Sequence, residues 1–296
     1  MKGPPKCATV TFEQLAYSNM LTLNALVELL TEKGVLSKPE ILKRIRKLQT
    51  PRLIASVLAL LMTAYASSPA KTIRFSGYDW KVKSGIHEGP GPNNWDENNV
   101  WVDQGGYLHL KLTKQGERWY CAEVLTKDRL GFGRYQFWVV GRVDRLDPNV
   151  VLGLFNYPTP DVGPDGTHEI DIEFAKWGKP EAPMGNYTVW PAGEGLRRAS
   201  KRFSVELNGA HTTHRFTWNP TSVTFQSLHG HRDDNSNQFE NWLYQPQEPP
   251  SYISQDAMPV EINLWLFHGQ PPRNGRQVEL VVRSFKFMPA QFTPAP

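Results

Sequence analysis

Cysteine is nearly absent from this sequence, which has two, Cys7 and Cys121, in 296 residues. Two cysteines exclude a disulfide framework and a cysteine-rich metal site, and their number does not indicate a cellular compartment. The chain also lacks repeated hydrophobic segments of about 20 residues, which excludes a polytopic membrane protein. Hydrophobic residues make up 40% of the chain and charged residues 21%, a mixture that excludes wholesale disorder and can bury a sizeable core.

Most of the chain also has no excess of positive or negative charge. The first 66 residues contain nine Lys or Arg and four acidic residues, whereas the rest contains 24 basic and 25 acidic residues. A nucleic-acid-binding domain gathers basic residues on its folded body. The near-neutral body of this chain therefore argues against a nucleic-acid partner.

The first 50 residues have a helical pattern. Apolar residues recur at helical spacing between residues 12 and 33, and Ser37-Lys38-Pro39-Glu40 is typical of a capping box that begins a second helix. The second helix has an apolar face and a basic face. We interpret residues 1–50 as a short α-helical extension of the main body.

Residues 51–70 form an apolar segment and a linker. A basic flank, an apolar run over residues 53–62 and Ala64-Tyr65-Ala66 follow the pattern of a secretory signal peptide, displaced from the N-terminus. Three interpretations stay open: an export signal, a membrane anchor through residues 53–66, or a third core helix. The first two predict a secreted, periplasmic or cell-surface protein, and the third predicts a cytoplasmic one.

Residues 71–288 contain no long amphipathic helix. Short alternating or β-branched runs are separated by Gly, Pro, Asn and Asp, which predicts strands. Strands in such number with short connections indicate an all-β sandwich or jelly roll, and residues 289–296 would be a C-terminal tail. The predicted strands are Thr72–Phe75, Asn99–Asp103, Tyr107–Thr113, Trp119–Thr126, Gly133–Val143, Val150–Phe155, His168–Phe174, Asn186–Trp190, His211–Trp218, Ser222–Ser227, Asn241–Gln245, Val260–His268 and Gln277–Phe287.

The most informative stretch is residues 168–174, HEIDIEF. Side chains of a strand alternate between its faces, so Glu169, Asp171 and Glu173 share one face and the apolar residues share the other. Repulsion and partial burial would keep a proton on one of these carboxyls at neutral pH. A glycosidase needs one ionised and one protonated carboxyl, as nucleophile and general acid. A solvent-facing acidic strand with no catalytic role is the alternative.

The stretch resembles the active-site signature E-[I/L]-D-[I/F]-E-F of glycoside hydrolase family 16. This family includes laminarinases, lichenases and xyloglucan endotransglycosylases, which have a concanavalin A-like β-jelly roll. Residues 75–80, 99–112, 122–135 and 262–266 resemble other strands of the family in the same order. The resemblance covers residues 72–288 and implies an all-β, concanavalin A-like β-jelly-roll sandwich.

By this resemblance Glu169 is the nucleophile, Asp171 the assisting carboxylate and Glu173 the general acid/base of a retaining endo-β-glycan hydrolase. The first expected substrate is β-1,3 or mixed-linkage β-glucan. The sequence FAKWG at residues 174–178 departs from the F-L-G of xyloglucan enzymes, so the substrate class stays open. A transglycosylase with the same residues and a carbohydrate-binding lectin on the same fold are the alternatives, although binding alone does not require three acids on one face.

The aromatic content of 11% suits either a large β-sandwich core or a sugar cleft, where rings stack on the apolar faces of pyranoses. Trp95 follows a Gly/Pro-rich loop and is expected to be an exposed platform. Alternation and the resemblance place the other candidates beside the acidic strand or on a second cleft strand. The predicted substrate-binding residues are Trp95, Trp177, Asn186, Trp190, Asn263, Trp265 and His268.

We predict no metal site and no cofactor. The family's frequent calcium-ligand Asp is missing from residues 280–285. His211 and His214 are three positions apart, which places them on opposite faces of a strand, and His229 and His231 lie in a predicted turn with no third ligand indicated. The expected partner is a polysaccharide, and we expect the protein to be a monomer.

Overall fold

The structure is a computed structural model that describes residue 33 and residues 70–291. The expected helical extension, the signal-like segment and most of the expected tail lie outside the described residues. None of the helices in the described part is long and apolar enough to cross a membrane.

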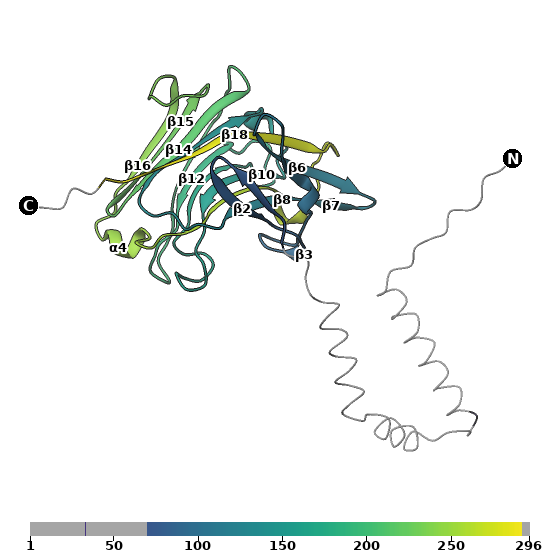
Figure 1. Cartoon of the computed structure of the whole chain (residues 1–296), viewed down its shortest axis with the longest axis horizontal. Coiled ribbons are helices and arrows are strands. Elements are labelled where there is room, and N and C mark those ends of the chain that lie inside the picture. Colours follow the sequence, from purple (N-terminus) through teal and green to yellow (C-terminus); the bar gives the residue numbers. More distant parts are fainter. Residues whose placement is uncertain (1–32, 34–69, 292–296) are drawn as a thin grey trace, which may run out of the picture. The chain divides into compact units, whose positions relative to one another are not determined.

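Two antiparallel sheets of eight strands make up the described domain (Figure 1). The first sheet carries the acidic strand β11 near one end, and β13 is its edge strand. In spatial order this sheet consists of β1 (Thr72–Phe75), β2 (Tyr78–Val82), β8 (Ala122–Thr126), β17 (Val260–Leu266), β10 (Val150–Asn156), β11 (Ile170–Phe174), β12 (Gly185–Val189) and β13 (Ala199–Phe203).

The second sheet is built from longer strands, of which β18 is the last in the chain. In spatial order it consists of β16 (Gln238–Tyr244), β15 (Ser222–His229), β14 (His211–Asn219), β9 (Gly133–Val140), β18 (Val278–Pro289), β6 (Leu108–Gln115) and β5 (Val100–Val102), with β7 (Arg118–Tyr120) paired to β6. A small hairpin and short helical turns complete the domain: β3 (Gly85–Glu88), β4 (Asn93–Trp95), η1 (Glu97–Asn99), η2 (Val143–Arg145), α4 (Pro249–Tyr252) and η3 (Phe267–Gly269).

The core lies between the two sheets because alternate residues of each strand are apolar. Ile170, Ile172 and Phe174 of β11 are fully buried in it. The ring of Phe174 lies 4.5 Å from that of His214 on β14, which links the two sheets. The face of β11 that carries the acids therefore points away from the core.

The predicted all-β sandwich is confirmed, and the exceptions have local causes. The predicted strand Trp119–Thr126 is broken at Cys121, which instead forms a bridge to Trp95. The acidic strand begins at Ile170 rather than His168, because His168 has a left-handed φ of 63°. The list of predicted strands missed β2, β13 and the β3–β4 hairpin. The sequence YDWKV of β2 does alternate, whereas those of β13 and the hairpin are polar and lack a clear alternation.

Candidate active site

An open cleft of about 1270 Å³ lies on the first sheet, on the face that points away from the core. The strand registers arrange its floor in two rows that cross the sheet. We call the first the glutamate row: Glu123 (β8), Asn263 (β17), Gly153 (β10), Glu173 (β11), Asn186 (β12) and Arg202 (β13). The second, the aspartate row, contains Leu125, Glu261, Phe155, Asp171, Thr188 and Ser200 on the same strands.

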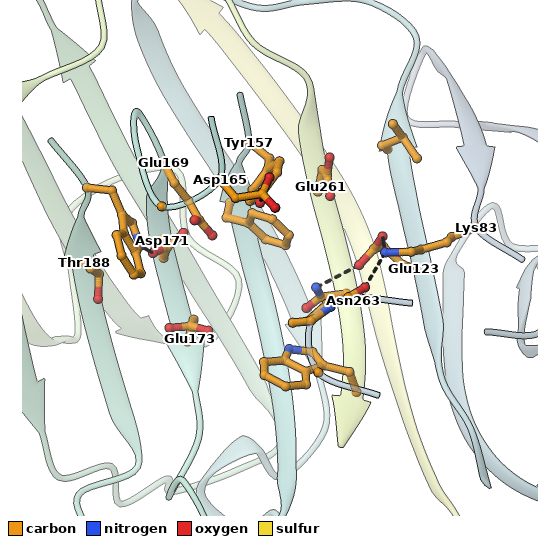
Figure 2. A pocket seen from close by; sticks show the side chains of 18 of the residues that line it. Lys83, Glu123, Tyr157, Asp165, Glu169, Asp171, Glu173, Thr188, Glu261 and Asn263 are labelled. Atoms are coloured by element: carbon orange, nitrogen blue, oxygen red, sulfur yellow. Dashed lines mark hydrogen bonds and ion pairs between the residues drawn. The ribbon is translucent and has the colours of Figure 1, made fainter. Parts of the chain in front are cut away.

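Glu169, Asp171 and Glu173 all line this cleft. Figure 2 shows the three carboxyls following one another along the chain, with Glu261, Asn263 and Glu123 beyond them on neighbouring strands. Asp171 is 2% exposed, whereas Glu169 and Glu173 are partly exposed. Because side chains alternate along β11, a shift by one residue would bury the acids and expose the core residues.

Burial raises the pKa of all three carboxyls. The pKa of Asp171 rises to about 7, although hydrogen bonds with Glu169 and Trp190 and the charge of Arg198 lower it. Burial, and then the negative charge of Asp171, hold the pKa of Glu169 and that of Glu173 well above the ordinary value. Protons are therefore retained on this strand at neutral pH, as a general acid requires.

Gly153 separates the acidic strand from β17 in the glutamate row. A Cβ atom at Gly153 would lie 2.4 Å from Oδ1 of Asn263, so a larger residue would displace that side chain. Asn263 donates from Nδ2 to Oε2 of Glu123 at 3.1 Å, and its buried Oδ1 has no hydrogen-bond partner within the described residues. The cleft floor therefore has a free acceptor close to the acids.

A second pair of acids, Glu123 and Glu261, occupies the β8–β17 end of the cleft. Lys83 lies 2.7 Å from Glu123, and Figure 2 marks this ion pair and the bond from Asn263. Burial raises the pKa of Glu123, which Lys83 lowers in part. Burial first and the charge of Glu123 second raise the pKa of Glu261 to about 8. This end of the cleft also retains a proton at neutral pH.

Five of the seven residues expected to bind substrate line the cleft: Trp177, Asn186, Trp190, Asn263 and Trp265. Trp177 and Trp265 lie with ring centroids 6.3 Å apart at one side of the floor. Asn186 is buried, and its amide group donates to the backbone oxygens of Ala175 and Met184 while accepting from Nε1 of Trp177. Its amide is thus occupied in holding Trp177 and the end of β11.

The expectation for Trp95 was wrong. Its side chain is 1% exposed and packs in the core, and it does not line the cleft. The Gly/Pro-rich loop folds back as the β3–β4 hairpin, so that Nε1 of Trp95 donates to the backbone oxygen of Glu88 at 3.2 Å. The ammonium group of Lys83 lies 4.3 Å from the ring centroid and covers it.

The prediction that His268 binds substrate in the cleft was also wrong. Strand β17 ends at Leu266, and the chain turns through η3, where His268 has a φ of 53°. The side chain is exposed and lies outside the cleft. Alternation along a strand says nothing about a residue beyond the strand's end.

The sequence analysis missed several cleft residues. Lys83, Glu123, Glu261, Arg198 and Arg202 all line the cleft. Alternation would have found Glu261, which lies two positions before Asn263 on the same strand. The others depend on which strands become neighbours, and the sequence carried no signal for that order.

One histidine of each pair has a protein partner. His214 is buried, and its two ring nitrogens lie 2.8 Å from the hydroxyls of Ser227 and Thr212. His231 stacks on Trp138 with centroids 5.1 Å apart. Within residues 70–291, no group of three or more His, Cys, Asp or Glu side chains has the arrangement of a metal site.

No protein-family model and no curated protein matches the sequence. Solved structures do match. A β-glucanase of Bacillus licheniformis is 20% identical, with a TM-score of 0.54 over 76% of this chain and 100% of that one. A pseudo β-1,3-glucanase of Mycobacterium tuberculosis is 21% identical, with a TM-score of 0.55 over 72% and 91%. A GH16 protein of a Bacteroides ovatus mixed-linkage glucan locus, in complex with its G4G4G3G product, is 13% identical, with a TM-score of 0.55 over 71% and 94%.

These likenesses concern the fold, since every identity quoted is 21% or less. The match covers nearly the whole length of each solved chain. The sheet order and the position of the acidic strand on the outward face agree with that match. The described domain has the concanavalin A-like β-jelly-roll fold of the glycoside hydrolase family 16 β-glucanases, as the acidic strand predicts.

Proposed function

We propose that this protein is a family 16 glycoside hydrolase that cleaves a β-glycan internally with retention of anomeric configuration. The observation that carries the proposal is a set of three carboxyls in an open cleft, two on β11 and one on the residue before it, each with a raised pKa. A shared acid set with retained protons is costly for a binding module and useful for acid–base chemistry.

The chemistry assigns one role to each acid. Glu169 attacks the anomeric carbon while Glu173 donates a proton to the leaving oxygen, and the glycosidic bond breaks. Asp171 shares a hydrogen bond with Glu169 that raises the pKa of Glu169 and lowers that of Asp171. Asp171 in its ionised form accepts the proton that Glu169 must lose before it attacks. Glu173 then removes a proton from a water molecule, whose oxygen displaces Glu169 and releases the sugar.

The shape of the cleft supports internal cleavage. The glutamate row crosses six neighbouring strands, which at about 4.8 Å per strand gives a path of about 24 Å. A path of that length, open to solvent, accommodates several sugar units on both sides of the acids. Trp177 and Trp265 offer aromatic surface beside it.

A β-1,3 or mixed-linkage β-glucan is the first substrate to test, because the structural neighbours include a β-glucanase and a GH16 protein bound to a mixed-linkage glucan product. A transglycosylase would use the same acids with a sugar hydroxyl in place of water. One of the structural neighbours with this fold is described as a pseudo β-1,3-glucanase. A lectin therefore remains the second candidate.

The test compares single amide variants in a reducing-sugar assay on laminarin and lichenan. Glu169→Gln and Glu173→Gln remove the nucleophile or the proton donor at constant size, so hydrolysis should fall by several orders of magnitude with an unchanged Tm. Proton NMR of the first product should show the β-anomer. Glu206→Gln, an exposed glutamate outside the cleft, is the matched control.

Three outcomes separate the candidates. Wild-type turnover in Glu169→Gln would contradict the assignment of the nucleophile. Binding of glycan by the wild-type protein without any hydrolysis would favour the lectin. Products longer than the substrate, formed when an oligosaccharide acceptor is added, would identify a transglycosylase.

We also propose that the segment at residues 53–66 directs the protein out of the cytoplasm, because a polysaccharide too large to cross a membrane must be met outside the cell.

A further inference from the structure

Strand β13 forms the edge of the cleft and presents two arginines to it. Arg198, Ser200 and Arg202 alternate onto the cleft side and all line the cleft. Ser200 and Arg202 end the aspartate and glutamate rows. The two Cα atoms of the arginines are four residues apart, or about 13 Å on an extended chain.

Neither guanidinium forms an ion pair or a hydrogen bond within the described part of the chain. Arg198 lies over the ring of Trp190, with its central carbon 4.4 Å from the ring centroid, and both arginines are exposed. Some exposed arginines of the domain have acidic partners, as Arg129 has in Asp161 and Arg74 in Asp79. Others, such as Arg118 and Arg197, have no ion pair within the described domain either, but they do not line the cleft. Arg198 and Arg202 thus have ten N–H donors between them that face the cleft without an anion.

The charge of the cleft is divided between its ends. The β8–β17 end carries Glu123 and Glu261 with Lys83, which is already paired with Glu123. The β13 end carries the two arginines. Their nearest acid in the glutamate row is Glu173, and β12, which carries Asn186, lies between Glu173 and Arg202. The proton that Glu173 retains at neutral pH reduces the negative charge of the middle of the floor.

Guanidinium groups bind carboxylates and sulfate esters through two parallel N–H···O bonds, which is their strongest mode of recognition. The hydroxyls of a neutral glycan cannot balance their charge. Within the described part of the protein their charge acts on acids only through space, where it lowers the pKa of Asp171 and of Glu173. A ligand with negative charge over β13 would accept hydrogen bonds from both guanidinium groups and balance their charge.

Resting on the proposed function, we propose that the substrate is a β-glycan whose sugar units over β13 carry anionic substituents, sulfate esters or carboxylates, which Arg198 and Arg202 bind. The neutral part of the chain then lies over the aromatic residues and the acids. Arg202 takes the more specific role, because it ends the row that contains Glu173.

The test measures binding to the full chain carrying Glu169→Gln, which prevents turnover of the probes. Three β-1,3-glucan hexasaccharides serve as probes in isothermal titration calorimetry: the neutral form, a C6-sulfated form and a C6-oxidised form with carboxylates. We expect one or both anionic probes to bind at least tenfold more tightly than the neutral probe, and the comparison of the two identifies the anion. The preference should shrink when ionic strength rises from 0.05 to 0.5 M, because salt screens exposed charges.

Substitutions locate the effect. Arg202→Gln and Arg198→Gln should each remove most of the preference for the anionic probe and leave affinity for the neutral probe unchanged. Arg197→Gln, an exposed neighbour that does not line the cleft, has the same change in charge and should keep the preference. Arg202→Lys retains the charge but loses the pair of parallel N–H donors, so it should lose affinity for the anionic probe. In an enzyme that keeps Glu169, the same substitution should leave the pH dependence of activity as in wild type.

Several results would overturn the inference. Equal binding of neutral and anionic probes, with hydrolysis of neutral glucan intact, refutes it and leaves the proposed function standing. An equal loss in Arg197→Gln and Arg202→Gln would mean attraction by net charge alone, which also refutes it. Absence of both binding and hydrolysis for every glycan refutes the proposed function as well.

Discussion

The indole Nε1 of Trp190 donates a hydrogen bond of 2.9 Å to Oδ2 of Asp171. This bond joins β11 to the residue that follows β12 and favours the ionised form of Asp171. It therefore offsets part of the effect of burial, and the pKa of Asp171 is raised to about 7. The hydrogen bond that Asp171 shares with Glu169 lowers the pKa of Asp171 as well. Trp190 is therefore one of the groups that lower the pH at which Asp171 loses its proton.

Replacing Trp190 with Phe tests that relationship. The change keeps a ring beneath Arg198 and removes the N–H, so the pKa of Asp171 should rise. The acidic limb of the pH dependence of kcat/KM should move to higher pH, with activity lost most at pH 5–6. Trp177→Phe removes an indole N–H that bonds Asn186 instead and should leave this limb in place. An unmoved limb in Trp190→Phe would contradict the role of the bond.

Glu261 should make the folded state less stable at alkaline pH. Its pKa is raised from 4.5 to about 8, so the stability that the protonated form confers is complete below about pH 4.5 and is lost as pH rises through 8. Glu261→Gln should therefore raise Tm at pH 8–9 by about 2–4 °C for each kcal/mol recovered, and change it little at pH 4.5.

Differential scanning calorimetry across pH 4.5–9 measures this effect. Glu117→Gln, whose side chain is 99% exposed on a turn, is the control and should leave the curve of Tm against pH unchanged. A uniform rise in Tm of Glu261→Gln at every pH would point to packing and not to ionisation.

Trp95 and Trp177 should respond differently to truncation. Trp95 is a core residue, so Trp95→Ala should cost about 3–5 kcal/mol of unfolding free energy. Trp177 lines the cleft and is partly exposed, so Trp177→Ala should weaken glycan binding, by about 1–3 kcal/mol if stacking on sugars resembles stacking on bases. Urea unfolding and calorimetric titration of both variants measure the two quantities. Weaker glycan binding by a stably folded Trp95→Ala protein would mean that the Trp95 ring contacts the glycan, and would contradict its assignment to the core.

The proposed export of the protein predicts its mature N-terminus. If residues 53–66 are removed as a signal, protein recovered from outside the cytoplasm should begin near Ser67. Intact-mass analysis of that fraction gives the cleavage site directly. A full-length product confined to the cytoplasm would support the third-helix interpretation instead.

The fold class and the acidic face follow from the amino-acid sequence alone. Alternation over residues 169–174 is enough to separate three acids from three core residues, because a strand has only two faces. The same reasoning grouped Asn263 with Trp265, and both line the cleft. These results depend on local backbone geometry, which neighbouring residues in the chain specify.

The residues that lie beside the acids depend on how the strands assemble. Glu123 and Arg202 stand 79 residues apart in the sequence and share one row only because β8, β17, β10, β11, β12 and β13 are neighbours in that order. Trp95 is buried because a loop folds back over it, and His268 leaves the cleft because its strand ends two residues earlier. Strand order and strand ends are set by the packing of the whole sandwich, where long-range contacts compete, and no local pattern contains that information.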